Sequence, residues 1–178
     1  YWYGWTGHST DIEKDFVAAI WNFPDNTLVG PKAYLTLFLQ EKILIPSPTN
    51  LVTRRSVVEE VGGYEEDFRD LFDDQVFVVK MSLAAPVLLL KGYFEKYRRH
   101  EDSITYISEN VTGEGKIMRE VYLNWVEKYL SELGVSNTQL WKVLRKELFP
   151  HRYPRLFSFY RGVGRYKEKV KALLKPTE

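Results

Sequence analysis

The stretch that most constrains the fold is residues 73–84, DDQVFVVKMSLA. Its apolar residues recur at spacings of three and four, which is the period of an α-helix. They cover two adjacent faces, so few polar positions remain. The pattern therefore predicts a mostly buried helix whose first turn, with Asp73 and Asp74, emerges at the surface. Pro86 is expected to end it.

An acidic loop that begins on paired glycines precedes this helix. Gly62 and Gly63 are expected to end a short helix over 56–61, because glycine adopts the left-handed conformation that closes helices. Asp73 and Asp74 then stand where unpaired N–H groups and the helix dipole favour ionised carboxylates. An ionised carboxylate there could accept a proton from a hydroxyl group. Acidic residues also occur in first turns simply because they cap helices, so a structural role stays open.

A second group of polar residues follows a buried strand predicted at 87–90. The segment Tyr97-Arg98-Arg99-His100 comes after it and could carry its side chains to a cleft. An arginine such as Arg98 matches phosphate oxygens through its planar guanidinium group. The ring of His100 could bind a metal or a phosphate oxygen. The alternative is an edge strand that enters a solvated loop.

Composition and charge narrow the classes of protein. The chain of 178 residues has no cysteine, which excludes disulfides and thiol nucleophiles. Its net charge is +1, but residues 151–178 hold eight Lys or Arg and two Glu. Such a basic tail is either a solvated helix face or a surface that contacts phosphates or anionic membranes. No phosphate-binding glycine loop, nucleophile elbow or zincin motif is present.

Local patterns predict the remaining elements. A polar stretch over 101–116, with two glycines, is expected to be a loop and a domain boundary, followed by helices alone. The other expectations are a strand over 1–6, a turn over 7–10, a helix start at Thr10, a turn over 23–26, a helix over 31–39, non-helical backbone over 45–50, a strand over 51–53, a helix over 118–133, a helix capped by Ser136 and broken at Phe149-Pro150, and a basic helical segment over 154–174.

Taken together, four segments resemble the bacterial glycosyltransferase family 2, whose members have the GT-A nucleotide-sugar fold. They are YWYGWTG, IPSPTNLVTRRSVVEEVGGYEEDF, LFDDQVF and YFEKYRRHEDS. The resemblance covers roughly residues 1–108. It implies an α/β fold with a partial GT-A-like sheet and flanking helices over residues 1–113. An all-helical extension over residues 114–178 would follow.

The resemblance implies a hexosyltransferase that inverts the sugar's anomeric configuration. A nucleotide-sugar would donate the sugar to a hydroxyl of a carbohydrate or lipid-linked acceptor. Asp74 would be the catalytic base, and Asp73 stands where the family usually has Glu. The other residues implied to bind substrate are Gly62, Gly63, Arg98 and His100, with His100 also as a metal ligand.

One part of the family pattern has no counterpart in this chain. The family's Asp-x-Asp metal-binding segment is missing, since Asp70-Leu71-Phe72-Asp73 has the wrong spacing. We therefore expect an acceptor-side part that is inactive alone, with a divalent Mg or Mn ion held mainly by residues outside this chain. A cytoplasmic location is expected; a position at the inner face of the membrane, with peripheral contact through residues 151–178, stays open.

Two further function classes stay open. The chain could be a non-enzymatic binding or scaffold module that uses the helical extension and basic tail. Nucleic-acid binding through residues 151–178 is the least favoured class, although aromatic and basic residues alternate there.

Overall fold

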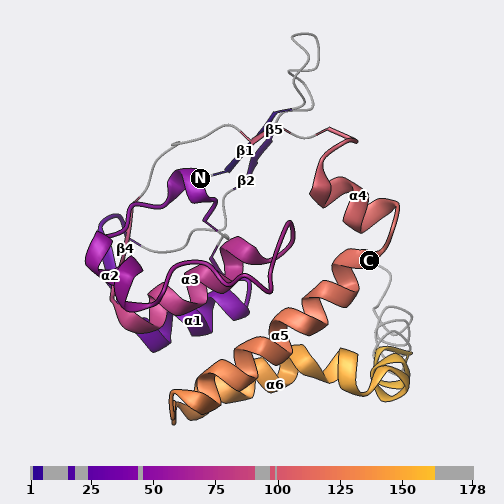
Figure 1. Cartoon of the computed structure of the whole chain (residues 1–178). Helices are drawn as coiled ribbons and strands as arrows, with labels where there is room; N and C mark the ends of the chain where they lie inside the picture. The colour runs from indigo at the N-terminus through magenta and orange to yellow at the C-terminus, as the bar shows by residue number, and fades with distance from the viewer. Residues whose placement is uncertain are drawn as a thin grey trace, which may run out of the picture.

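The computed structural model describes residues 2–5, 16–18, 24–43, 46–90, 97–98 and 100–162 of the chain. Its strands are β1 (Trp2–Trp5), β2 (Phe16–Ala18), β3 (Thr27–Val29), β4 (Val87–Leu89) and β5 (Tyr97–Arg98). Its α-helices are α1 (Pro31–Leu39), α2 (Arg55–Glu60), α3 (Asp73–Ala84), α4 (Ile104–Asn110), α5 (Glu114–Glu132) and α6 (Thr138–Arg152), and residues 154–162 are also helical. The mixed α/β class expected from the sequence is confirmed, with helices predominating (Figure 1).

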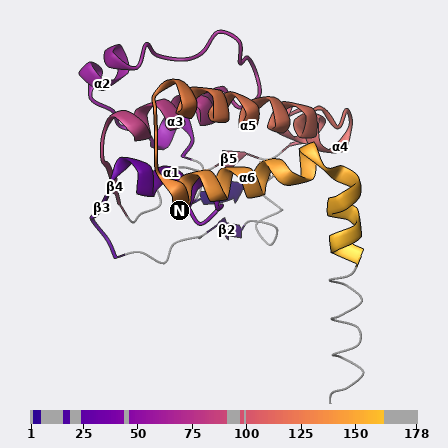
Figure 2. The same ribbon diagram turned by 90° about the horizontal axis from the view of Figure 1, so that it is seen from below.

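The hydrophobic core lies among four helices. Helix α1 contacts α3 and α6, while α5 also contacts α3 and α6, so the four form a closed ring of neighbours. Figure 2 shows α3 and α5 in one layer and α1 and α6 in the other. Each helix contributes a side chain that is fully shielded from solvent: Leu35, Val79, Leu123 and Leu144. Burying each of these stabilises the fold by about 1.5–3 kcal/mol relative to leaving it exposed.

Two small sheets accompany the helices, and the first of them contributes Val29 and Leu89 to the core cluster. Strand β3 pairs antiparallel with β4, with Val29 opposite Val87. Strand β1 lies between β2, which is antiparallel to it, and β5, which is parallel. The predicted strand over 1–6 is therefore confirmed at residues 2–5. The strand predicted at 87–90 is not a buried one, because Leu89 is buried while Leu88 and Leu90 are exposed.

Helix α3 has the predicted bounds, and most of it is buried as expected. Helix α1 is also confirmed, with Pro31 in its first turn, where a missing N–H group leaves no hydrogen bond unmade. The turn predicted over 23–26 is confirmed at Asp25 and Asn26. The predicted end of α2 is confirmed as well, since the N–H group of Gly63 donates to the carbonyl of Val58 at 3.0 Å.

Several predicted boundaries were wrong. Residues 51–53 form no strand, and Pro48–Asn50, expected to be non-helical, form a 3₁₀ helix in which proline occupies the first position. The predicted loop over 101–116 contains α4 and the start of α5. Helix α4 is stable there because the hydroxyl of Ser103 accepts the N–H group of Tyr106 at 3.2 Å.

Helix α6 differs from its prediction at both ends. Asn137, rather than Ser136, caps it, because the Asn137 Oδ1 atom accepts the N–H group of Leu140 at 2.9 Å. At the other end, Pro150 lies inside the helix and does not break it. The helix continues because the N–H group of Tyr153 still donates to the carbonyl of Phe149, at 2.9 Å.

Other expectations from the sequence fall partly or wholly beyond what the structure describes. The turn over 7–10, the helix start at Thr10 and everything beyond residue 162 lie outside the described residues. The division at residue 113 stays a prediction; the core cluster holds side chains from both sides of it, such as Leu35 and Leu144. Within the described ranges, none of the helices has the length and apolar character needed to cross a bilayer.

Candidate functional site

The backbone is strained immediately before the two predicted catalytic aspartates. Asp70 and Phe72 both have left-handed conformations, with φ of 70° and 66°. This conformation costs an L-residue roughly 1–2 kcal/mol, and such outliers cluster at functional sites. The ring of Phe72 is held by stacking on Tyr122, with the ring centroids 5.2 Å apart. Packing against α5 therefore sets the position at which the chain enters α3.

Asp74 is partly buried in the first turn of α3. Its Oδ1 atom accepts the backbone N–H group of Gln75 at 2.7 Å. Burial raises the pKa of Asp74 above the usual 3.8, the hydrogen bond from Gln75 opposes that shift, and the neighbouring charge of Asp73 adds to it. No described cation forms an ion pair with this carboxylate. Asp74 is therefore a stronger proton acceptor than an exposed aspartate.

Two tyrosines lie within reach of the charge on Asp74. Tyr64, in the acidic loop, stacks on Phe77 of α3 with centroids 4.3 Å apart. Burial raises the pKa of Tyr64, and the charges of Asp73 and Asp74 raise it further. Burial also raises the pKa of Tyr122 on α5, where Arg119 acts in the opposite direction and Asp74 adds to the increase.

The hydroxyl group of Tyr122 is a buried polar group with an unmet hydrogen bond. The residue is only 1% exposed, and no described residue forms a hydrogen bond with its hydroxyl oxygen. A buried polar atom in this state costs about 1–3 kcal/mol, and native structures contain few of them. This hydroxyl is close enough to the acidic start of α3 for the charge of Asp74 to raise its pKa.

The acidic loop is fastened to α3 by a buried ion pair. Lys80 is 4% exposed, and its Nζ atom lies 2.5 Å from Oε1 of Glu65. A second contact is between aromatic rings: buried Phe68 packs edge to face against Trp125 of α5, with ring centroids 6.0 Å apart. The loop that precedes Asp73 is thus attached to both α3 and α5.

Gly62 and Gly63 occupy left-handed conformations, with φ of 73° and 68°. A Cβ atom placed on either would meet nothing within 4 Å, so close packing does not explain the glycines. Their role in closing α2 does, because other L-residues adopt this conformation only at a cost. Substrate binding by these glycines stays a prediction.

Arg98 and His100 lie in a different part of the fold. Arg98 ends β5, opposite Trp5 of β1. His100 is exposed, and its carbonyl oxygen accepts the hydroxyl of Ser103 at 2.8 Å. Where side chains are described, no contact joins His100 to Asp73 or Asp74. No three His, Asp or Glu side chains of the described residues are grouped to hold a metal, so a metal role for His100 stays a prediction.

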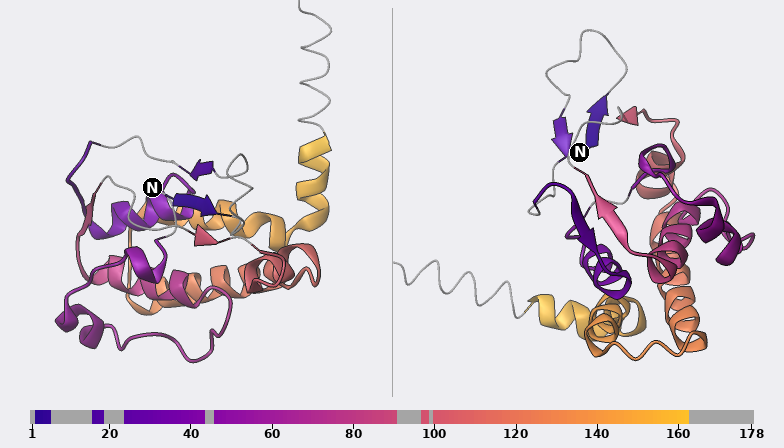
Figure 3. Two further views of the ribbon diagram at one scale, coloured as in Figure 1. Left: turned by 90° about the horizontal axis from the view of Figure 1, so that it is seen from above. Right: turned by 90° about the vertical axis from the view of Figure 1, so that its left-hand side faces the viewer.

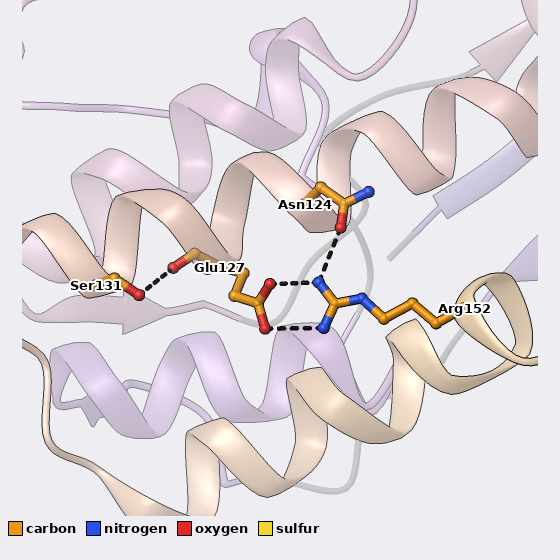
Figure 4. Close-up of polar contacts among 4 residues, drawn as sticks. All are labelled: Asn124, Glu127, Ser131 and Arg152. Carbon is orange, nitrogen blue, oxygen red and sulfur yellow. Dashed lines mark hydrogen bonds and ion pairs between the residues drawn. The ribbon is translucent and has the colours of Figure 1, made fainter.

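A shallow pocket of about 520 Å³ lies elsewhere, over α5 and α6, and none of the predicted site residues lines it. Two of its lining residues are bound by Arg152, which forms a two-point ion pair with Glu127 and donates to Oδ1 of Asn124 at 3.0 Å (Figure 4). The hydrogen bond and charge of Arg152 lower the pKa of Glu127. These contacts join the two helices and use the polar groups that a ligand would need.

Comparisons of this chain with protein-family models, with curated proteins and with solved structures found no match. The local geometry therefore carries the functional argument. Sequence reasoning identified Asp73 and Asp74 but missed Tyr122 and Tyr64 as their neighbours. Tyr64 follows Gly63 directly and could have been noticed; Tyr122 gave no signal beyond its place in an apolar stripe.

Proposed function

We propose that this chain carries the acceptor side of an inverting glycosyltransferase, with Asp74 as the catalytic base. The observation that carries the proposal is the state of Asp74: a partly buried carboxylate without a described cation partner, whose pKa burial raises. A base of higher pKa takes a hydroxyl proton more readily.

The proposed reaction transfers one proton, forms one bond and breaks one bond. The acceptor hydroxyl gives its proton to the Asp74 carboxylate as its oxygen attacks the anomeric carbon of the donor sugar. The bond from that carbon to the phosphate oxygen breaks, and its electron pair leaves with the nucleoside diphosphate. Asp73 is proposed to accept a hydrogen bond from the acceptor, although it is one methylene shorter than the family's usual Glu.

One feature of the fold supports a partial GT-A-like arrangement. The segments YWYGWTG and YFEKYRRHEDS, which carried part of the resemblance, contribute β1 and β5, and these strands are parallel neighbours. Parallel pairing needs a long crossover connection, as in α/β folds. We propose that the phosphates of the donor lie near Arg98 and His100 and the acceptor near Gly62 and Gly63.

The resemblance also implies a divalent metal. The described residues offer no cluster that could hold one, so the proposal routes no step through a metal ion. When bound in the family, such a metal neutralises the charge of the leaving phosphates.

The test is Asp74→Asn in the full-length natural protein, assayed for transfer from nucleotide-sugars to hydroxyl acceptors. We expect turnover to fall at least ~10²-fold with folding intact, as for the loss of a positioned base. Asp67→Asn is the matched control, since Asp67 is exposed in the same acidic loop, and it should keep its turnover. Near-normal turnover in Asp74→Asn removes this residue from the mechanism.

The second candidate is a non-enzymatic binding or scaffold module. The observation that favours it is the exposed aromatic and basic surface after α6, which does not involve Asp74. The double variant Asp73→Ala with Asp74→Ala separates the two candidates. A scaffold keeps its binding in this variant, whereas the glycosyltransferase loses its transfer activity.

A further inference from the structure

The helical segment over residues 154–162 stands apart from the rest of the described structure. It leaves α6 at a sharp bend and projects away from the four core helices (Figures 2 and 3). Its attachment is a cluster of rings around Phe149 of α6. Tyr153, Phe157 and Tyr160 have ring centroids 5.7, 6.4 and 6.3 Å from that of Phe149.

One side of this segment is apolar and open to solvent. Phe159 and Tyr160 are 67% and 63% exposed, and Tyr153 and Leu156 are about half exposed. Leu156 and Tyr160 are four residues apart in this helix and share one helical face. Tyr153 lies at its start, where its carbonyl accepts the N–H group of Phe157 at 2.9 Å. Contiguous exposed apolar groups of this kind mark an interaction surface.

Basic residues border this apolar face. At about 100° per residue, Arg155 falls beside Phe159 at one edge of the face and Arg161 falls beside Phe157 at the other. The guanidinium group of Arg161 lies over the Phe157 ring, 5.8 Å from its centroid. Residues 151–162, HRYPRLFSFYRG, contain no acidic side chain.

We propose that the face formed by Tyr153, Leu156, Phe159 and Tyr160 docks on an anionic phospholipid surface. The helix would lie in the plane of the interface, with its rings among the acyl chains and Arg155 and Arg161 at the headgroups. Helices that bind membrane surfaces combine these features: apolar and aromatic groups on one face and Lys or Arg beside them. Aliphatic Leu156 at the centre of the face favours lipid over single-stranded nucleic acid, which binds by stacking on rings.

Cosedimentation of the whole 178-residue chain with lipid vesicles tests the proposal. We expect retention on vesicles that mix phosphatidylcholine with phosphatidylglycerol, little retention on phosphatidylcholine alone, and weaker retention as salt rises. The variant Leu156→Ser with Phe159→Ser should weaken binding to anionic vesicles about tenfold or more. Arg155→Gln with Arg161→Gln should also weaken it and reduce its salt dependence.

The matched control is Ile117→Ser, which removes an exposed apolar side chain from α5 and should leave vesicle binding unchanged. Circular dichroism shows whether each variant keeps its helices. The proposal is overturned if the chain is not retained on anionic vesicles at low salt, or if the Leu156 and Phe159 variant binds like the unchanged chain. A single-stranded oligonucleotide that binds more tightly than anionic vesicles also overturns it, in favour of nucleic acid. These outcomes are independent of Asp74, so they separate this proposal from the proposed function.

Discussion

The Nζ atom of Lys80 lies 2.5 Å from Oε1 of Glu65, and this ion pair joins the middle of α3 to the acidic loop before it. The two partners differ in their surroundings, because Lys80 is buried while Glu65 is partly exposed. The contact spans a loop that carries Phe68 and the left-handed Asp70 and Phe72. It therefore helps to hold the strained entry into the helix that bears Asp74.

We predict that replacing one partner of this ion pair destabilises the protein more than replacing the other. Glu65→Gln leaves a buried, uncompensated ammonium group and should lower the free energy of unfolding by about 3 kcal/mol. Lys80→Met leaves a carboxylate that water can reach and replaces the lysine with an apolar chain of similar length, so it should cost less. Urea denaturation of both variants at neutral pH measures the difference. Equal losses in the two variants would contradict the asymmetry.

Asp74 should destabilise the fold when it is ionised. Burial raises its pKa in the folded chain above the usual 3.8. At pH values between 3.8 and the folded pKa, the folded state therefore binds more protons than the unfolded state. The contribution of Asp74 to stability is then most favourable below pH 3.8 and falls as pH rises through its folded pKa. Asp74→Asn keeps the acceptor for the Gln75 N–H group and removes the charge, so it should be more stable than the unchanged chain at neutral pH. Denaturation at pH values below and above 3.8 checks this; a variant that is less stable at neutral pH would show that the shift has the opposite sign.

Substitution by glycine should have opposite effects on stability at the two left-handed residues. Asp70 is exposed, so Asp70→Gly relieves backbone strain at little other cost and should raise stability by about 0.5–1 kcal/mol. Phe72→Gly relieves the same strain but removes the stacking on Tyr122, so it should lower stability by about 2–3 kcal/mol. Thermal denaturation of both variants measures the signs. A loss of stability in Asp70→Gly would mean that its side chain contributes more than the strain costs.

We predict that Asn137 alone provides the N-cap of α6. Asn137→Ala removes the acceptor for the Leu140 N–H group and should cost about 1 kcal/mol. Ser136→Ala, one position earlier, should change the stability by only a few tenths. Comparison of the two variants by urea denaturation tests this assignment directly. If Ser136→Ala were the more costly change, the cap would belong where the sequence pattern had placed it.

The sequence predicted elements well where apolar residues repeat with a clear period. The bounds of α3 follow from such a repeat, and those of α1 from a repeat with a starting proline. Helix α4 was missed because its polar composition gives no repeat; it forms because Ser103 caps it and α5 packs against it. Pro150 misled in the opposite direction, since the N–H group of Tyr153 still donates to the carbonyl of Phe149 beyond it.

The candidate site could be predicted only in part for a similar reason. Adjacent aspartates before an apolar helix are visible in the sequence, whereas the raised pKa of Asp74 depends on burial. The unpaired hydroxyl of Tyr122 depends on the contact between α3 and α5, which are separated by a long stretch of chain. The parallel pairing of β1 with β5 is non-local in the same way. Local patterns contain no information on such pairings.

The contact between α1 and α6 has a consequence for how the chain matures during translation. The chain between Phe38 and the start of α6 at Thr138 is about a hundred residues long, so Leu35 and Phe38 leave the ribosome well before the helix that packs against α1. Until α6 emerges, these apolar groups remain open to misassociation with other nascent chains. A holding chaperone is therefore expected to bind the polypeptide during that interval, and a stalled product that ends before Thr138 should be degraded rapidly.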